Sequence, residues 1–354
     1  MVPGLAQRFR RPVHGVAVAC EDKVTSLTKE TAAQAWLAMR RVALIYNPVS
    51  GQYSARRATV ITDALALLRS AGIEAEALET NAPGSAGARA EEAILRGCDT
   101  IFACGGDGTV HEVLQRLVGT PVALGVVPMG TANALAQDLG LGKSPLKAVH
   151  LLLNAIPTQV PVGHIFYRDS AGAERSRYFT VAAGIGADAL LMSRLDAGLK
   201  RRFGYVLYLV EAFRVWATSP FPLFRAEFMQ SPGATPRVEQ VSQLLAVRVR
   251  SFGGALGKLA PGATLCKDTL RLLAFKTRSR YHYLSFLLAV VAGRHTFRKH
   301  VELLAAVSVH CSVDDGSPVP IFVEADGEVL GTMPVRIEVA PQRLTLLVPP
   351  HARP

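Results

Sequence analysis

The chain has 354 residues, of which 49% are hydrophobic and 19% charged, so it is long enough for two domains and too apolar to be disordered. Lysine and arginine outnumber aspartate and glutamate by 39 to 28, which gives a formal net charge of +11. This excess attracts phosphates, anionic lipids or nucleic acids, and charge alone does not choose among them. Five cysteines without metal-type CxxC pairs indicate a reduced setting. No apolar run reaches the roughly 20 residues that a membrane-spanning helix needs.

After a weakly ordered N-terminal extension, residues 1–40, strand, loop and helix alternate along the chain. Strands are predicted at 42–46, 73–78, 100–104 and 122–127, followed by helices around 61–68, 88–95, 109–113 and 132–139. This alternation predicts a parallel sheet covered by helices. Because ligands bind beyond the carboxyl ends of the strands in such a sheet, the loops after the strands are expected to converge on one rim.

The pattern changes after about residue 158 to apolar segments with interruptions. Strands are predicted at 178–183, 243–249, 270–275, 320–324, 335–339 and 344–348. Closely spaced strands without intervening helices predict an antiparallel β domain. Two aromatic-rich helical segments interrupt it, at 203–216 and 281–291.

A glycine-rich turn, Gly105-Gly106-Asp107-Gly108-Thr109, ends the third predicted strand. Its glycines remove the Cβ atoms that would keep the backbone from a close approach to a ligand. The positive end of the following helix suits phosphate, whereas Asp107 needs a cation between its carboxylate and any phosphate. Thr109 and Glu112 fit a capping box at the start of the helix. A tight strand-to-helix turn without a ligand explains the glycines equally well.

An ordered set of motifs is similar to that of the diacylglycerol kinase catalytic family over about residues 41–350. The motifs are Asn47-Pro-Val-Ser-Gly51, Thr80, Gly105-Gly-Asp-Gly-Thr109, Pro128-Met-Gly-Thr-Ala-Asn133, Gly184-Ile-Gly186 and Asp326-Gly-Glu328. The resemblance is closest to bacterial lipid kinases that also resemble sphingosine and ceramide kinases. It implies an ATP-binding α/β domain, residues 41–157, and a β-sandwich lipid-substrate domain, residues 158–325. Residues 326–354 would close the cleft that holds the active site and return toward the first domain.

The resemblance implies that the protein uses ATP and Mg²⁺ to transfer a γ-phosphate to the hydroxyl of a membrane lipid, which is diacylglycerol or a sphingoid or ceramide-like lipid. It assigns Asp326 the role of general base. Related sphingosine kinases give this role to the GGDG aspartate, so Asp107 is the alternative base beside the phosphates. The residues expected to contact ATP are Asn47, Thr80, Gly105, Gly106, Asp107, Gly108, Thr109, Val110, His111, Thr131 and Glu328.

Two further sites follow from the same resemblance. A structural Mg²⁺ is expected on the backbone carbonyls of Leu265 and Leu270 and the carboxylate of Asp268, because oxygen ligands suit this ion. Asp268 as an ordinary loop residue is the alternative. Asp188 is expected either to position the substrate hydroxyl or to serve as a structural loop carboxylate.

The sequence departs from the family's pattern at several positions. Ala134 and Pro161 stand where aspartates are expected, so two acidic members of the family's Asp–water–Mg²⁺ network are absent. Altered metal handling or weaker activity is predicted. His111 replaces a common asparagine, either as in sphingosine kinases or as an ordinary helix-surface histidine. Asp326-Gly327 also fits a hairpin turn without a catalytic role.

Both aromatic-rich helices combine apolar and basic residues, which predicts contact with an anionic membrane surface. Covering the β domain is the other explanation for them. The protein is expected to be cytoplasmic and peripherally membrane-associated, with no nucleic-acid partner, while a homodimer is left open. Two rival functions remain: NAD kinase-like phosphorylation of a soluble nucleotide, and a degenerate nucleotide-binding module that recruits partners to membranes.

Overall fold

The computed structural model describes eight parts of the chain. These are residues 39–48, 56–82, 84–194, 211, 213–252, 259–291, 300–313 and 320–352. Almost all of the expected N-terminal extension, 1–40, and most of the helix expected at 203–216 lie outside the described residues.

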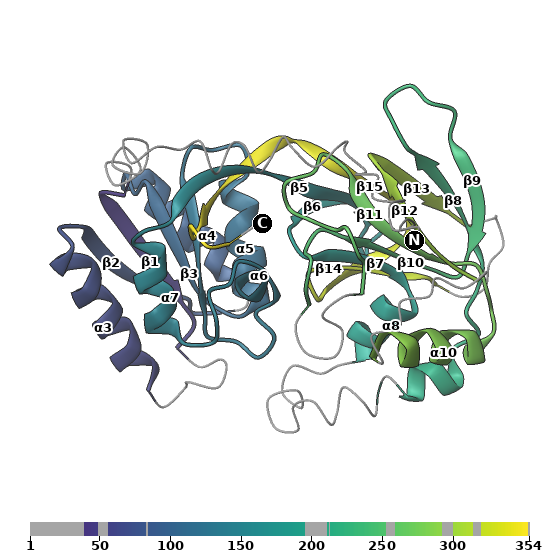
Figure 1. Cartoon of the computed structure of the whole chain (residues 1–354), viewed down its shortest axis with the longest axis horizontal. Coiled ribbons are helices and arrows are strands. Elements are labelled where there is room, and N and C mark those ends of the chain that lie inside the picture. The colour runs from purple at the N-terminus through teal and green to yellow at the C-terminus, as the bar shows by residue number, and fades with distance from the viewer. Residues whose placement is uncertain are drawn as a thin grey trace, which may run out of the picture.

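The N-terminal part is a four-stranded parallel sheet with helices in the connections (Figure 1). Its elements are β1 (Arg41–Tyr46), α3 (Arg57–Ser70), β2 (Glu74–Glu79), α4 (Ser85–Leu95), β3 (Thr100–Gly105), α5 (Asp107–Leu117), β4 (Ala123–Pro128), α6 (Ala134–Asp138) and α7 (Pro145–Leu152). The strands lie in the order β4-β3-β1-β2. Every residue of β3 and β4 is buried, as expected of strands covered on both faces.

The C-terminal part consists mainly of antiparallel strands and two helices. Its elements are β5 (Ile156–Arg168), β6 (Glu174–Phe179), β7 (Ala182–Gly186), α8 (Ala187–Arg194), β8 (Phe224–Met229), β9 (Arg237–Val241), β10 (Gln243–Val247), β11 (Leu270–Phe275), α10 (Arg280–Val291), β12 (Val301–Ala306), β13 (Ser308–Ser312), β14 (Phe322–Ala325) and β15 (Glu328–Val348). Strands β12-β11-β10-β7-β14-β15 are neighbours in that order, and β15 continues to β4, so both parts share one mixed sheet. The predicted fold class, a parallel α/β part followed by antiparallel β-structure, is confirmed.

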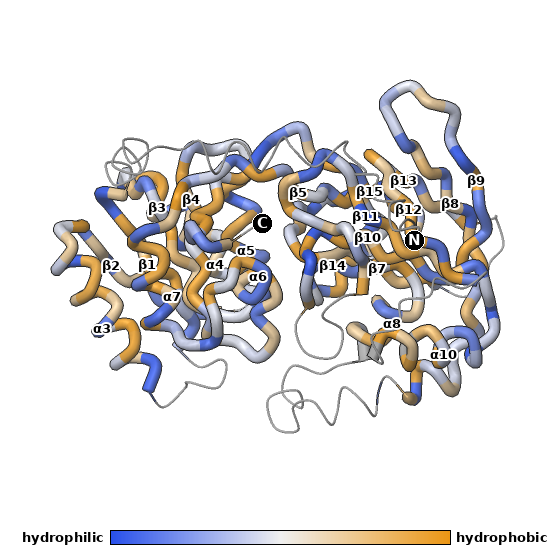
Figure 2. The backbone as a smooth tube through the Cα atoms, viewed as in Figure 1, coloured by the Kyte–Doolittle hydropathy of each residue, from blue (hydrophilic) through white to orange (hydrophobic). Residues whose placement is uncertain are grey.

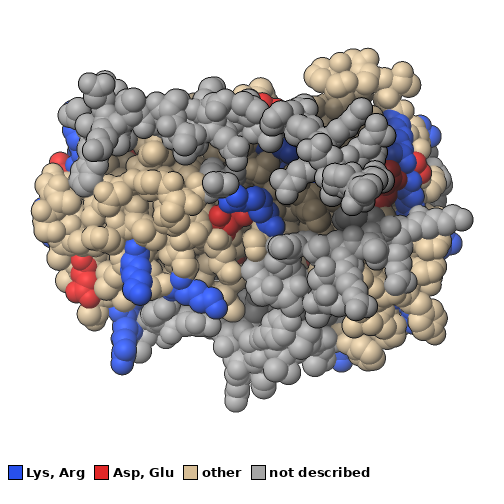
Figure 3. All heavy atoms as spheres, in the orientation of Figure 1, with Lys and Arg blue, Asp and Glu red and all other residues tan. Residues whose placement is uncertain are grey.

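The buried hydrophobic side chains form two clusters, and many segments of the strands are orange in Figure 2. One cluster fills the α/β part and continues onto one face of β10 and β11, and the other lies within the C-terminal part. The core of the C-terminal part is rich in aromatic and branched side chains, including Phe179, Phe224, Phe228 and Ile337. The charged side chains on the surface are arranged differently from these buried clusters. On the face drawn in Figure 3, the described lysines and arginines lie apart rather than in one continuous patch.

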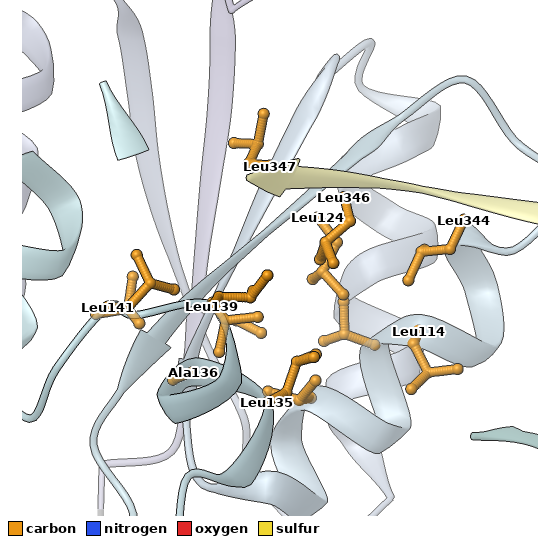
Figure 4. Close-up of a cluster of buried hydrophobic side chains, with 14 of the residues drawn as sticks. Leu114, Leu124, Leu135, Ala136, Leu139, Leu141, Leu344, Leu346 and Leu347 are labelled. Carbon is orange, nitrogen blue, oxygen red and sulfur yellow. The ribbon is translucent and has the colours of Figure 1, made fainter. Parts of the chain in front are cut away.

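The two parts are joined by a long antiparallel pair of strands, β5 and β15, which run from one part to the other near the top of Figure 1. Their pairing extends from Ile156 opposite Val348 to Arg168 opposite Thr332, with two irregularities. The two segments predicted at 335–339 and 344–348 are therefore one strand. Near its end, Leu346 pairs with Leu124 of β4 in the parallel sense. The end of β15 thus packs among leucines of the α/β part (Figure 4).

Substitution of Leu346 by alanine is expected to lower the free energy of unfolding by about 2–5 kcal/mol, because it leaves a cavity in a packed core. Leu346 is 0% exposed. The matched control is Leu95→Ala on α4, where the leucine is 82% exposed, and its expected effect is within about 0.5 kcal/mol. Denaturant unfolding followed by circular dichroism compares the two variants. Equal effects would show that the end of β15 does not stabilise the α/β core.

Candidate active site

Loops from four strands meet at the carboxyl edge of the parallel sheet. Tyr46, at the end of β1, pairs with Glu79 of β2 and Cys104 of β3, and Gly105 pairs with Pro128 of β4. The residues that follow these strand ends therefore share one edge of the sheet. They include the expected nucleotide contacts Asn47, Thr80, the turn 105–111 and Thr131.

The glycine turn after β3 is fitted against the loop after β4. A Cβ on Gly130 would lie 2.4 Å from the Cα of Gly106, so the two backbones touch and neither residue can carry a side chain without displacement. The side chain of Asn133 holds the second loop in shape, because it accepts from the N–H of Gly130 and donates to the carbonyl of Gly130, both at 2.9 Å. Asn133 itself has a positive φ of 50°. The two loops thus form one rigid unit.

Asp107 joins these two loops. Its carboxylate accepts from the N–H groups of Asn133, at 2.9 Å, and Ala134, at 2.8 Å, which are the N-cap residue and the first residue of α6. Burial raises the pKa of Asp107, the amide of Ala134 opposes this, and the nearby charge of Asp326 raises it further. Asp107 therefore has a structural role in holding the loop after β4. Its closeness to Asp326 also places it at the site.

The predicted capping box between Thr109 and Glu112 is wrong. Helix α5 begins two residues earlier than expected, at Asp107, so Thr109 lies inside its first turn, and no side chain caps the helix. Glu112 instead accepts from the N–H groups of Gly84, at 2.9 Å, and Ala86, at 2.8 Å. Its carboxylate therefore stabilises the N-terminus of the neighbouring helix α4.

Asp326 lies in a backbone cradle that the sequence did not indicate. Residues 178–183 were predicted to be one strand, but the strand breaks between β6 and β7 at Thr180 and Val181. The freed N–H groups point at the Asp326 carboxylate: Thr180 donates at 3.1 Å, Val181 at 2.8 Å and Ala182 at 3.1 Å. Asp326 and Gly327 both have positive φ, 49° and 85°, as in a type I′ hairpin turn. The hairpin interpretation and a functional carboxylate are therefore compatible.

His111 and Glu328 connect this turn to α5. His111 is buried, with 4% exposure, and its Nδ1 lies 3.4 Å from Oδ2 of Asp326, so the helix-surface alternative is wrong. Glu328 lies on the other side of the turn, with its Oε1 2.9 Å from the position that a Cβ on Gly108 would take. The Asp-Gly-Glu turn and the glycine turn thus face each other across the two parts of the chain.

Asp188, which is half-buried, forms a carboxyl pair with the buried Glu324, which was not predicted. A Cβ on Gly184 would lie 2.8 Å from both Oδ2 of Asp188 and Oε1 of Glu324, so this glycine makes room for the pair. Burial raises the pKa of Asp188 to about 6, and a hydrogen bond from Glu324 opposes the shift. Burial raises the pKa of Glu324 as well, as do the charges of Asp188 and Asp326. Both shifts favour the protonated form of the two carboxyl groups, and the second oxygen of Glu324 accepts from the Gly327 N–H at 2.8 Å.

The residues expected to bind a structural Mg²⁺ do not fit that role. The carbonyl of Leu265 accepts a hydrogen bond from the guanidinium of Arg248 at 2.9 Å. Asp268 is mostly exposed and pairs with Arg343 instead. Leu270 begins β11, where it pairs with Ala306. Within the described parts of the chain, no group of three or more His, Cys, Asp or Glu side chains could hold a metal ion.

A cavity of about 260 Å³ lies away from this site, at the amino ends of the parallel strands. Its lining includes Ile73, Thr100, Ala123 and Leu347. None of the expected site residues contributes to it. The convergence of polar groups at the opposite edge, rather than this cavity, marks the candidate active site.

Comparisons with known proteins agree with the fold and the motifs. Residues 41–165 match the diacylglycerol kinase catalytic domain, and residues 180–348 match the YegS C-terminal NAD kinase beta sandwich-like domain. A diacylglycerol kinase of Bacillus subtilis (strain 168) is 26% identical over 299 residues, which cover 84% of this chain and 92% of the relative. A diacylglycerol kinase of Mycobacterium tuberculosis (strain ATCC 25618 / H37Rv) is 28% identical over 316 residues, covering 88% and 96%.

The crystal structure of a diacylglycerol kinase from Bacillus anthracis str. Sterne has the same fold. It superposes with a TM-score of 0.62 at 18% identity, covering 89% of this chain and 98% of that one. The fold and the matches define a two-domain protein with a kinase-type α/β domain and a β-sandwich-like domain. The chain belongs to the diacylglycerol kinase catalytic domain family and carries a C-terminal domain of the YegS type.

The Asp188–Glu324 pair makes stability depend on pH. Because both pKa values are raised by folding, the folded protein binds protons at this pair more strongly than the unfolded chain, and the free energy of unfolding falls as pH rises from about 4 through 6 and above. Glu324→Gln keeps both contacts, because the amide can donate to Asp188 and its oxygen can accept from Gly327. We expect the variant and the wild type to melt alike at about pH 4, and the variant to melt a few degrees higher at about pH 8.

Thermal melting followed by circular dichroism between these two pH values measures this difference. Glu91→Gln, at an exposed position on α4, is the matched control and should follow the wild type throughout. A Glu324→Gln variant that melts below the wild type at high pH would show that the pair is not a source of strain.

Proposed function

We propose that the protein is an ATP-dependent kinase that transfers the γ-phosphate to the hydroxyl of a membrane lipid. The observation that supports this most directly is the approach of the Asp-Gly-Glu turn to the glycine turn. Asp326 contacts His111 of α5, and Glu328 lies against Gly108 in the first turn of the same helix. An acceptor for a hydroxyl proton therefore stands beside the edge where a nucleotide's phosphates would bind, as phosphoryl transfer requires.

In this proposal, the glycine turn and the first amides of α5 bind the phosphates of ATP, since a helix N-terminus favours anions. Asn47, Thr80 and Thr131 offer hydrogen bonds from the neighbouring loops. Asp326 accepts the proton of the lipid hydroxyl, and its three backbone donors fix the direction in which its remaining lone pair points. Asp107 is the alternative base, with a carboxylate already committed to two amides of α6.

Mg²⁺ fits the charge of the site. Asp107, Asp326 and Glu328 bring carboxylates to the glycine turn, where ATP would add further negative charge, and Mg²⁺ is usually held by one or two carboxylates together with phosphates. Asp107 and Glu328 would hold the ion, which would neutralise phosphate charge when bound. The protein's own contribution is to keep these carboxylates and the hydroxyl acceptor in fixed positions.

Asp188 would position the lipid hydroxyl within reach of Asp326. It lies in the first turn of α8, and its hydrogen-bond partner Glu324 also holds the Asp326-Gly327 turn through the Gly327 N–H. A protonated carboxyl can donate a hydrogen bond to a hydroxyl oxygen, which a pair of carboxylates cannot. Such a donor would hold the lipid hydroxyl oxygen while Asp326 accepts its proton.

An exposed apolar face on the C-terminal part supports a membrane lipid as the substrate. We call it the docking face; it consists of Phe213 (65% exposed), Tyr281 (73%), Leu284 (37%) and Leu288 (60%). Arg214, Arg278 and Arg280 are exposed beside it. Figure 1 shows α10 and α8, which carries Asp188, at the same end of this part, and most of α10 is hydrophobic in Figure 2. No described helix is both long and apolar enough to cross a membrane.

The docking face has a fixed shape, because the segment 213–218 is tied to α10. Nε1 of Trp216 donates to the carbonyl of Arg280 at 2.8 Å, and the guanidinium of Arg280 donates to the carbonyl of Ala217 at 2.6 Å. The ring of Phe213 packs against that of Trp216, with 5.4 Å between centroids. Exposed aromatic and aliphatic side chains flanked by arginines suit the interface of an anionic bilayer.

Asp326→Asn is expected to lower phosphate transfer from ATP to lipid at least about 100-fold, because an amide cannot accept the hydroxyl proton. Transfer of radioactive γ-phosphate is measured with diacylglycerol, sphingosine, ceramide and NAD as acceptors. Asp63→Asn, at an exposed position on α3, is the matched control and should retain full activity. Asp326→Asn also places a side-chain amide opposite the Thr180 N–H, which donates to Asp326 in the wild type. Activities are therefore compared below the melting temperature of the Asp326→Asn variant.

Each outcome of this assay bears on the proposal. Label in NAD alone would assign a soluble nucleotide as the substrate, and no label in any acceptor would favour a nucleotide-binding module without activity. If the Asp326→Asn variant retains full activity, Asp326 is not the base, and Asp107 becomes the candidate for that role.

Binding to phosphatidylglycerol-containing vesicles is expected to weaken about tenfold or more when Tyr281 and Leu288 are both replaced by serine, because two exposed apolar anchors are lost. Binding of the wild type should fall as salt increases, since the arginines act through screened attraction. Co-sedimentation measures both effects. Val238→Ser, at a 46% exposed apolar position on β9, is the control. Unchanged binding of the double variant would place membrane contact elsewhere.

A further inference from the structure

A buried arginine stands at the place where the family resemblance implies a structural metal. Arg248 follows β10 directly and is 0% exposed. Its Nη1 donates to the carbonyls of Lys267, at 2.8 Å, and Thr269, at 2.9 Å. Its Nη2 donates to the carbonyls of Pro161, at 2.7 Å, and Leu265, at 2.9 Å. Four backbone oxygens from two separate segments thus surround one guanidinium group.

We infer that the guanidinium of Arg248 takes the place of a structural divalent cation, so that the loop before β11 keeps its conformation without bound metal. The loop residues 261–269 contain no helix or strand, so their carbonyls have no partners in a regular ladder. Buried carbonyls without a donor are costly, and a cation that contacts several of them removes this cost. Arg248 supplies both the charge and the directed N–H groups.

The expected carboxylate ligand has turned away from this centre. The side chain of Asp268 is 66% exposed and pairs with Arg343 of β15. Among the expected ligands, only the carbonyl of Leu265 contacts the guanidinium, and the carbonyls of Lys267 and Thr269 complete the loop's contribution. A planar guanidinium donates in fixed directions and needs no carboxylate to complete a coordination shell. Backbone carbonyls without a carboxylate therefore suffice for the guanidinium, whereas the expected metal site includes the carboxylate of Asp268.

Pro161 fits the same replacement. An aspartate is expected at this position, where it would add a negative charge beside a divalent ion. Proline offers only its carbonyl oxygen, and this oxygen makes the shortest contact with the guanidinium, at 2.7 Å. A guanidinium carries one positive charge where a divalent ion carries two, so it needs fewer negative charges around it. Proline in place of an aspartate at position 161 fits this lower requirement and keeps the charge in the buried centre small.

The guanidinium remains charged at neutral pH. Burial lowers the pKa of Arg248 to about 10, and the nearby charge of Asp268 opposes the shift. The same residue is tied to the candidate active site through its backbone, because its N–H donates to the carbonyl of Val181 at 2.9 Å. Val181 in turn donates to Asp326 at 2.8 Å. The centre therefore anchors the strand break that forms the Asp326 cradle.

The first test uses the full-length wild-type protein without nucleotide, so that no ATP-bound Mg²⁺ is present. After dialysis, elemental analysis is expected to find fewer than about 0.1 equivalents of Mg²⁺ or Ca²⁺, and EDTA is expected to shift the melting temperature by less than about 1 °C. One equivalent of bound metal, or a melting temperature that drops in EDTA, would overturn the inference. This result is independent of whether the protein phosphorylates a lipid.

The second test compares substitutions of the arginine. Arg248→Met leaves the carbonyls without donors and is expected to lower the melting temperature by about 5 °C or more, while Arg248→Lys, which keeps a charge with fewer donors, should lose less. Arg343→Met removes the exposed partner of Asp268 and none of the four hydrogen bonds of the Arg248 guanidinium, so it should shift the melting temperature by about 1 °C at most. An Arg248→Met variant as stable as Arg343→Met would contradict the inference, and if it does not fold, the EDTA measurement on the wild type decides.

Discussion

The antiparallel pairing of β5 with β15 is the constraint on which the candidate site depends. These strands run through both parts of the chain, and their register extends from Ile156 opposite Val348 to Arg168 opposite Thr332. Because β15 begins at Glu328 and ends beside β4, one strand fixes the Asp-Gly-Glu turn relative to the parallel sheet. A slip of this pairing would move Asp326 and Glu328 away from α5. The geometry of the site is therefore set by backbone hydrogen bonds far from its reactive groups.

Backbone amides, rather than positively charged side chains, hold both aspartates of the site. Asp107 accepts from two amides of α6, and Asp326 accepts from three amides at the break between β6 and β7. A carboxylate has about four lone-pair positions, so Asp326 keeps little freedom to accept from a substrate in any other direction. His111 lies beside one of the same oxygens, at 3.4 Å. The cradle thus fixes the orientation of the Asp326 carboxylate and limits its access to solvent.

The sequence was sufficient for features that depend on local pattern. Alternating strands and helices predicted the parallel sheet, and the carboxyl ends of its strands predicted the rim that holds Asn47, Thr80 and the glycine turn. It was insufficient wherever a side chain acts on a distant segment. Glu112 fits a local capping box in sequence, yet it stabilises α4, 26 to 28 residues earlier in the chain. The break at Thr180 and the partnership of Asp188 with Glu324 likewise depend on contacts between remote strands, which no local spacing reveals.

Arg248 shows how this limit affects the interpretation of motifs. The family resemblance assigns Leu265, Asp268 and Leu270 to a metal site, but whether a loop binds metal depends on what else can reach its carbonyls. A residue 17 positions from Leu265 and 87 positions from Pro161 does so here. A guanidinium provides a single charge that does not exchange with solvent ions, so the loop beneath the Asp326 cradle would be insensitive to metal supply. Any dependence of the proposed kinase on Mg²⁺ would then arise from the ion that accompanies the nucleotide at the active site.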